Sequence, residues 1–261
     1  MADNERENGQ TTLKPVKTIL VSQPKPERSP YYELEKKYDL TIDWRPFIHV
    51  EGVTDKEFRK NRVYPNDFSA VIFTSKNSID HFFRLCEDMR IQMSAETKWF
   101  CMTEAVANYL QKFIVYRKRK VFAGKRTIQD LKPALMKHKK NERFFLPCSN
   151  LGAKQVTRFL DENEFDYADA MMYRTVSSDL SDLSDVKYDI LVFFSPLGIK
   201  SLYENFPEFS QDETRMAVFG NSTSKAVTDR GLEINIKAPT PETPSMTMAL
   251  ERYIRQSNQD N

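Results

Sequence analysis

The sequence contains few of the residues around which cofactor and metal sites are usually built. Only 7 of its 261 residues are glycine, and no GxGxxG or GxxxxGK[ST] run is present, which excludes the common glycine-rich cradles for dinucleotides and nucleoside triphosphates. Its three cysteines, Cys86, Cys101 and Cys148, show no CxxC spacing, and its three histidines are scattered. We therefore predict a protein without a metal site, a disulfide framework or a bound cofactor.

Long hydrophobic runs are also missing. The longest strand-like apolar run, Ile190–Phe194, is far too short to cross a bilayer, and residues 1–14 lack the apolar core of a signal peptide. We expect residues 1–14 to be disordered and residues 256–261 to form a frayed tail. Hydrophobic residues make up 40% of the chain, which is enough for a packed core. The sequence thus predicts a globular cytoplasmic protein with no membrane partner.

Positive charge is concentrated in one stretch of the chain. The formal net charge is only +2, but residues 112–143 hold twelve Lys or Arg against two acids, Asp130 and Glu142. Such a stretch attracts polyanions, and it is equally typical of a solvated helix face, so both interpretations stay open. Because it carries neither a helix-turn-helix nor an RNP-like aromatic motif, we predict no nucleic-acid partner.

The most informative feature that is present is a strand–turn–helix pattern that occurs twice. An apolar run, a hydroxyl-rich turn and a helical pattern cover Val71–Ile79 and again Leu191–Ile199. Each copy is followed by a further pattern of this kind, at Phe100–Ala107 and Val218–Ala226, at nearly the same offset. A repeat of this length implies two related lobes with a cleft between them, where function usually resides.

The alternation of strands and helices predicts an α/β fold of two similar lobes. Each lobe would contain a parallel β-sheet flanked by helices, because βαβ units produce parallel strands. Strands Ile42–Val50, which contains Pro46, and Ala168–Val176 do not fit this alternation, so we predict that they form a two-stranded linker. The expected boundaries are residues 15–42 with 177–255 for lobe 1, residues 43–50 with 168–176 for the linker, and residues 51–167 for the inserted lobe 2.

Small hydroxyl and amide side chains fill the turns between strands and helices. Thr74–Asn77, Ser195–Gly198 and Asn221–Ser224 each lie where a strand ends and a helix begins. As helix caps these residues would satisfy backbone N–H groups, and that role alone explains their presence. Alternatively, free N–H groups and helix dipoles at the carboxyl ends of the strands bind an anion. Because several such turns recur, neither interpretation is preferred at this point.

A series of short motifs runs from about Ile19 to Ile254 in a characteristic order. The motifs are Ile19–Ser22, Pro46–Ile48, Val71–Ile79, Met172–Thr175, Phe194–Pro196, Gly220–Val227 and Ala238–Pro241. Together they resemble the uroporphyrinogen-III synthase family, which cyclises hydroxymethylbilane in tetrapyrrole (heme) biosynthesis. Two departures stand out, since Gln23 replaces a frequent arginine and Gly220–Thr223 lacks the proline of the family's Gly-Pro-Thr-Thr turn.

The resemblance implies a reaction and a set of site residues. The family removes the terminal hydroxyl of hydroxymethylbilane as water, forms an azafulvene and then a spiro intermediate, and closes the ring with the last pyrrole inverted. Tyr173 matches the family's tyrosine in a Tyr-Arg-Thr motif, which implies that its phenol assists departure of the hydroxyl by hydrogen bonding. The implied substrate-binding residues are Ser75, Lys76, Asn77, Thr103, Ser149, Ser195, Arg215, Ser222 and Thr223.

The function expected from the resemblance is that of a hydro-lyase that uses no cofactor and no metal. Its substrate would be a linear tetrapyrrole polycarboxylate, and we expect a monomer that makes at most a transient contact with the upstream deaminase. The alternative is a non-catalytic two-lobed module that binds a polyanionic ligand or partner through residues 112–143. Tyr173 and the hydroxyl turns favour the synthase, because a binding module needs no group that assists a leaving hydroxyl.

Overall fold

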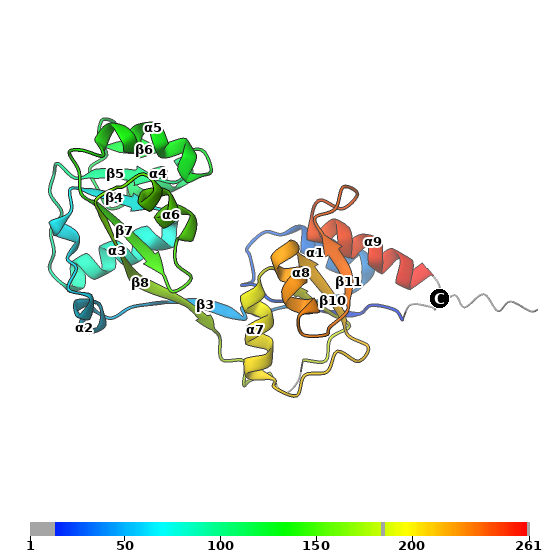
Figure 1. Ribbon diagram of the computed structural model, residues 1–261. Coiled ribbons are helices and arrows are strands. Elements are labelled where there is room, and N and C mark those ends of the chain that lie inside the picture. The colour runs from blue at the N-terminus through cyan, green and yellow to red at the C-terminus, as the bar shows by residue number, and fades with distance from the viewer. Residues whose placement is uncertain (1–13, 184–185, 260–261) are drawn as a thin grey trace, which may run out of the picture. The chain divides into compact units, whose positions relative to one another are not determined.

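The computed structural model describes residues 14–183 and 186–259, and these form two compact units (Figure 1). Unit 1 takes the chain up to His49 and again from Val176, and unit 2 is Val50–Thr175. The chain therefore passes between the units twice, within strands β3 (Ile48–Gly52) and β8 (Tyr167–Ser177). The disorder predicted for residues 1–13 and for the last two residues of the tail lies outside the described residues.

Unit 1 is built on a five-stranded parallel sheet with the strand order β11-β10-β9-β1-β2. The strands are β1 (Thr18–Val21), β2 (Thr41–Trp44), β9 (Ile190–Phe193), β10 (Arg215–Phe219) and β11 (Ile234–Ala238). The helices are α1 (Pro30–Tyr38), α7 (Pro196–Asn205), α8 (Asn221–Thr228) and α9 (Met246–Gln259).

The two faces of this sheet bury alternate residues of the same strands. Ile19 and Val21 of β1 pack in one hydrophobic cluster with residues of α1 and α9, whereas Leu20 packs in a second cluster with residues of α7 and α8. Since successive side chains of a strand point to opposite faces, a continuous apolar run is what a sheet covered on both sides requires. Unit 1 therefore has a layer of helices on each face of its sheet.

The second sheet has six strands in the order β3-β8-β7-β4-β5-β6, and its pairs from β8 to β6 are parallel. Besides β3 and β8, its strands are β4 (Ala70–Phe73), β5 (Lys98–Cys101), β6 (Val121–Ala123) and β7 (Phe144–Ser149). The helices are α2 (Asp55–Phe58), α3 (Lys76–Asp88), α4 (Glu104–Leu110), α5 (Ile128–His138) and α6 (Lys154–Glu162), with 3-10 turns at Arg59–Asn61 and Pro65–Asp67.

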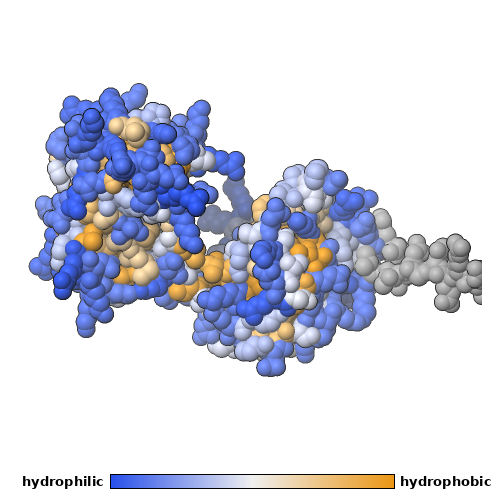
Figure 2. Space-filling model, in the orientation of Figure 1, coloured by the Kyte–Doolittle hydropathy of each residue, from blue (hydrophilic) through white to orange (hydrophobic). Residues whose placement is uncertain are grey.

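Unit 2 also buries both faces of its sheet. Val71 and Phe73 of β4 pack with residues of α3 and α4, and Ile72 between them packs with residues of α5 and α6. The predicted α/β fold, with two parallel sheets flanked by helices, is confirmed. Hydrophilic residues cover most of the visible surface of each unit in Figure 2. In the part of the chain that the structure describes, no helix has both the length and the apolar character needed to cross a membrane.

The strand expected over Ile42–Val50 is in fact two strands that belong to different sheets. β2 ends at Trp44 and pairs with β1 in unit 1, and β3 begins at Ile48 and pairs with β8. Pro46 lies between them, and because it has no N–H to donate, it interrupts a continuous ladder. β3 and β8 are neighbours, and β8 also pairs with β7 and so continues the six-stranded sheet. The two-stranded linker stays a prediction.

The chain end is more helical than expected. Residues 256–259 form the last turn of α9 instead of a frayed tail. Ile254 and Ser257 of this helix are fully buried, and Asn258 accepts a hydrogen bond from the backbone N–H of Val16 at 3.0 Å. These contacts fix the end of the helix on the first described residues of the chain.

Candidate functional site

Helix α3 begins at a tightly capped turn at the carboxyl edge of the unit 2 sheet. Ser75, directly before the helix, accepts a hydrogen bond from the backbone N–H of Ser78 at 3.1 Å, and the Ser78 hydroxyl in turn accepts one from the backbone N–H of Ser75 at 3.2 Å. This reciprocal capping box satisfies two backbone donors that would otherwise have no partner. The Ser75 hydroxyl accepts in the cap, so its own proton remains available for another acceptor.

Tyr173 reaches this turn from β8, far away in the sequence. Its phenol oxygen lies 3.4 Å from the Ser75 hydroxyl oxygen, and only 7% of the residue is exposed. Tyr173 is also the pairing partner of Ser149, the last residue of β7. The structure therefore brings three sequence-predicted site residues, Ser75, Ser149 and Tyr173, to one edge of one sheet.

A residue that sequence reasoning missed lies against Tyr173. The imidazole of His81, on α3, stacks on the Tyr173 ring with 5.0 Å between ring centroids and 15° between planes. His81 is half-buried, and burial followed by the neighbouring Arg84 guanidinium lowers the pKa of His81. The sequence showed His81 only as one of three scattered histidines, with no signal that linked it to Tyr173.

The other predicted residues of unit 2 lie at the same edge with different degrees of exposure. Thr103 caps α4 by accepting a hydrogen bond from the Val106 N–H at 3.3 Å, and the Ser149 hydroxyl accepts one from the Leu151 N–H at 3.2 Å. Lys76 and Asn77 are exposed on the first turn of α3. The Lys76 ammonium lies 5.4 Å from the centroid of the Tyr109 ring. These residues present hydroxyls, an amide and one cation to solvent, a set suited to carboxylates.

In unit 1, Ser195 plays the same structural part as Ser75. It precedes α7 with an extended backbone and accepts a hydrogen bond from the Gly198 N–H at 3.3 Å. Pro196 occupies the first position of the helix, where its missing N–H costs nothing. The cap interpretation of the predicted turns is confirmed for Ser75 and Ser195, and Thr103 caps its helix in the same way.

We predict that Ser195→Ala lowers the free energy of unfolding of unit 1 by about 1 kcal/mol, because the N–H at the third position of α7 loses its acceptor. Ser195→Asp should retain most of the stability, since its carboxylate can accept the same hydrogen bond. Ser222→Ala, a serine-to-alanine change at an exposed site of the same unit, serves as the matched control. Urea unfolding of the three variants measures the difference, and equal midpoints for Ser195→Ala and Ser222→Ala would show that the cap contributes nothing.

The start of α8 differs from the starts of α3 and α7 because no side chain of the described residues caps it. Gly220 occupies the cap position at φ 84°, a left-handed conformation that favours glycine. Ser222 is exposed in the first turn of the helix. Thr223 is fully buried, and its hydroxyl oxygen has no hydrogen-bond partner among the described residues. Of the two predicted hydroxyls in this turn, Ser222 is thus the one that is open to solvent.

Arg215 is not brought to this edge of the sheet. It is the first residue of β10, whereas Gly220 follows the strand's last residue, so the two lie at opposite edges. The Arg215 guanidinium is buried; it donates to the backbone carbonyl of Lys14 at 2.5 Å and lies 3.8 Å from an Asp189 carboxylate oxygen. The arginine is therefore placed to hold the amino-terminal edge of unit 1 together.

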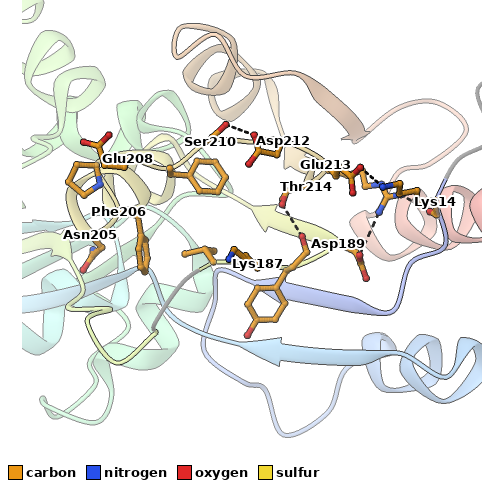
Figure 3. Close-up of a pocket in the computed structure, with 15 residues that line it drawn as sticks. Lys14, Lys187, Asp189, Asn205, Phe206, Glu208, Ser210, Asp212, Glu213 and Thr214 are labelled. Atoms are coloured by element: carbon orange, nitrogen blue, oxygen red, sulfur yellow. Dashed lines mark hydrogen bonds and ion pairs between the residues drawn. The ribbon is translucent and has the colours of Figure 1, made fainter.

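A pocket of about 840 Å³ lies at that amino-terminal edge of unit 1 (Figure 3). Its polar lining groups bind one another: Lys14 pairs with Glu213, the Ser210 hydroxyl donates to Asp212 at 2.7 Å, and the Thr214 hydroxyl donates to the Tyr188 carbonyl at 3.0 Å. None of the hydroxyl turns lines this pocket. Of the site residues predicted from the sequence, the pocket is lined only by Arg215.

The basic stretch at residues 112–143 lies on the surface of unit 2. Most of its lysines and arginines are exposed, and Val115, in the loop after α4, is 83% exposed. Lys139 is half-buried, and Lys120 is buried and pairs with Glu96 at 2.7 Å. Exposure of this kind fits both interpretations of the stretch that the sequence left open.

The fold defines an α/β protein of two lobes. In one lobe, the buried Tyr173 of β8 contacts Ser75, whose hydroxyl caps α3. The chain belongs to the Uroporphyrinogen-III synthase HemD family, whose model matches residues 31–248. The resemblance expected from the sequence motifs is thus confirmed.

Individual proteins similar to this chain carry the same name as the family. A uroporphyrinogen-III synthase of Chlorobaculum parvum is 23% identical over 255 residues, covering 92% of this chain and all of its own length. The uroporphyrinogen-III synthetase structure from Helicobacter pylori has a TM-score of 0.58 at 17% identity, covering 91% of this chain and 98% of that one. A mutant uroporphyrinogen III synthase from Thermus thermophilus has a TM-score of 0.53 at 14% identity, covering 93% and 99%. At these identities the structures establish the fold.

Proposed function

We propose that the protein is a uroporphyrinogen-III synthase, which converts hydroxymethylbilane into uroporphyrinogen III with loss of water and inversion of ring D. Family membership over residues 31–248 supports this reaction. The observation that carries the proposal is the contact of the Tyr173 phenol with the Ser75 hydroxyl, 3.4 Å apart at the carboxyl edge of the unit 2 sheet. A binding module would have no use for a buried phenol held at a helix start.

The reaction needs no strong acid or base, but it needs the substrate to be held in the correct orientation. The bond between the terminal carbon and its hydroxyl breaks as electrons move in from the pyrrole. The hydroxyl leaves as water, and the proton that it gains is balanced by the one that the pyrrole N–H loses as the azafulvene forms. The Tyr173 phenol donates a hydrogen bond to that oxygen while negative charge grows on it. The azafulvene that remains is attacked by the substituted carbon of ring D, and the resulting spiro intermediate reopens and recloses with ring D inverted.

The substrate's carboxylates would be held by the hydroxyl turns. Ser75, Thr103 and Ser195 accept backbone N–H groups in their caps, so each hydroxyl can donate its proton to a carboxylate. At the start of α8, which no side chain within residues 14–183 and 186–259 caps, the helix terminus and the exposed Ser222 hydroxyl are left for an anion. Lys76, Asn77 and Ser149 complete the proposed substrate-binding set, which leaves out the fully buried Thr223.

Holding a flexible linear tetrapyrrole in a folded shape is the main catalytic contribution that we propose. Correct orientation of reacting groups can lower a barrier by several kcal/mol, up to about 7–11 kcal/mol in ideal cases. The same restraint suppresses direct head-to-tail closure, which gives the type I isomer. We further propose that the protein is a cytoplasmic monomer that works without a cofactor and contacts the upstream deaminase only transiently.

The test is an isomer assay with enzymatically generated hydroxymethylbilane. We expect the purified protein to divert the product from uroporphyrinogen I to uroporphyrinogen III, which chromatography of the oxidised porphyrins resolves. A ratio unchanged from the spontaneous reaction would reject the synthase. It would instead favour the alternative, a polyanion-binding module that uses the basic stretch of residues 112–143.

A further inference from the structure

The stacked pair of His81 and Tyr173 joins two elements that are distant in the sequence. Their rings lie nearly parallel, 15° apart, with centroids separated by 5.0 Å. Tyr173 is buried and belongs to the hydrophobic cluster that also contains residues of helices α3 and α4. The imidazole therefore lies over one face of the phenol ring whose oxygen meets Ser75.

Arg84 fixes the orientation of the imidazole. Its Nε donates to His81 Nδ1 at 3.4 Å. Because a guanidinium can only donate, Nδ1 is the acceptor, and the proton of the neutral ring is on Nε2. Arg84 is itself held by the Val53 carbonyl at 2.7 Å and by Asp88 at 2.8 Å.

Gly52 leaves the space that this arginine occupies. A Cβ at Gly52 would lie 2.7 Å from a terminal nitrogen of Arg84, which is closer than side-chain carbons approach. A chain of contacts thus runs from the end of β3 through Arg84 and His81 to Tyr173 and the start of α3. Each link is a hydrogen bond or a ring contact within unit 2.

We infer that His81 is a positioning residue, held by Arg84 as a neutral Nε2–H imidazole, that keeps the Tyr173 phenol aimed at the helix start where the substrate's hydroxyl departs. The inference rests on the proposed function for the identity of the reaction. His81 acts through Tyr173, by packing against the phenol ring and limiting its swing about the Cα–Cβ bond, and gives or takes no proton in the reaction itself. Its loss lowers turnover because the phenol then samples orientations that do not reach the leaving oxygen.

The charges around His81 set the pH range in which the arrangement holds. Asp80 and Arg84 on α3 and the Tyr173 phenol on β8 surround the ring, and Asp80 accepts a hydrogen bond from Tyr109 of α4 at 2.8 Å. Burial and Arg84 lower the pKa of His81 more than Asp80 raises it. The neutral ring is therefore maintained at neutral pH. As pH falls through this lowered pKa, the ring becomes a cation beside Arg84 and can no longer accept its hydrogen bond.

The first experiment measures turnover and isomer ratio for His81→Ala and His81→Phe. We expect His81→Ala to lower kcat by about three- to tenfold, the size that an aromatic contact carries, with a smaller change in KM. His81→Phe should retain most of the turnover at pH 8 and lose the acidic inflection of kcat that His81 causes in the wild type. Wild-type turnover in His81→Ala, or an equal loss in both variants, would overturn the inference.

His138→Ala is the matched control. His138 is also half-buried in unit 2 and packs on an aromatic ring, that of Phe122, at 5.0 Å, but within the cluster on the other face of the sheet. Its removal costs a similar aromatic contact without touching Tyr173. We therefore expect wild-type kcat in His138→Ala, and a loss equal to that of His81→Ala would show that only general destabilisation was measured.

The second experiment needs no substrate and so separates this inference from the proposed function. NMR of the ligand-free protein should show a nuclear Overhauser effect between the His81 and Tyr173 rings. A titration should place the pKa of His81 below that of a free histidine, and Arg84→Gln should raise it. An absent ring contact, or a His81 pKa unaffected by Arg84→Gln, would overturn the inference even if the wild type forms uroporphyrinogen III.

Discussion

Tyr173→Phe is expected to slow formation of uroporphyrinogen III by about 10- to 100-fold while leaving the protein folded. The reason is that the phenol's only proposed chemical part is a hydrogen bond to a charged leaving oxygen, and such bonds contribute roughly 1.5–3 kcal/mol. The phenylalanine keeps the ring that stacks on His81 and packs in the core. The contact of the phenol oxygen with Ser75 is long at 3.4 Å, so its loss should change the free energy of unfolding by less than about 1 kcal/mol.

The measurement is single-turnover formation of each isomer, followed by urea unfolding of the same preparation. Tyr167→Phe is the matched control, because Tyr167 is on the same strand and donates its hydroxyl to Asp161 at 2.7 Å, away from Ser75. We expect wild-type isomer formation in Tyr167→Phe. If Tyr173→Phe also forms uroporphyrinogen III at the wild-type rate, the phenol has no part in departure of the hydroxyl.

The local pattern of the sequence was sufficient to predict the repeated elements. Apolar runs followed by Ser75 and Ser195 indicated the strands β4 and β9 and the helices α3 and α7 because strand burial and helix capping both depend on residues close together in the chain. Two parallel sheets followed from the alternation of these elements. Family resemblance added Tyr173, which no local pattern distinguishes from the other tyrosines.

At three places where the structure differs from the sequence-based predictions, the difference depends on the position of a residue within a helix or strand. Pro46 divides a run that looks like one strand, and the two halves join different sheets. Arg215 precedes the strand that leads to Gly220, so the length of β10 separates it from the turn. Thr223 is next to Ser222, yet the rotation of about 100° per residue in a helix turns one hydroxyl inward and the other to solvent.

The contact of His81 with Tyr173 could not be read from the sequence at all. It requires that α3 lie across the sheet at one particular angle, so that its second turn meets β8, which is separated from β4 by β7 in the sheet order. Packing of this kind is set by the whole core of unit 2 and not by any short segment. The same core therefore determines the geometry of the site, so a substitution in the core of unit 2 should affect the site as well.

Phe82→Ala is expected to lower the free energy of unfolding of unit 2 by about 3–5 kcal/mol, since truncation of a buried aromatic ring leaves a cavity that its neighbours fill only in part. Phe82 is fully buried on α3. Its ring lies 5.3 Å from that of Phe73 in an edge-to-face arrangement, 6.1 Å from that of Trp99 and 5.9 Å from that of Phe145. It thus connects the helix that carries His81 and follows Ser75 to three strands of the sheet.

Hydrogen exchange detects where the loss occurs, because each unit has its own hydrophobic clusters. Amides of residues 50–175 should lose protection in Phe82→Ala, whereas those of unit 1 should keep it. Leu250→Ala, in the core of unit 1 on α9, should produce the reverse pattern, and Phe113→Ala, at a site that is 38% exposed, should produce a much smaller loss. Equal loss of protection in both units of Phe82→Ala would show that they unfold as one. In that case the stability of the Tyr173 site would depend on every core residue of the chain and not on unit 2 alone.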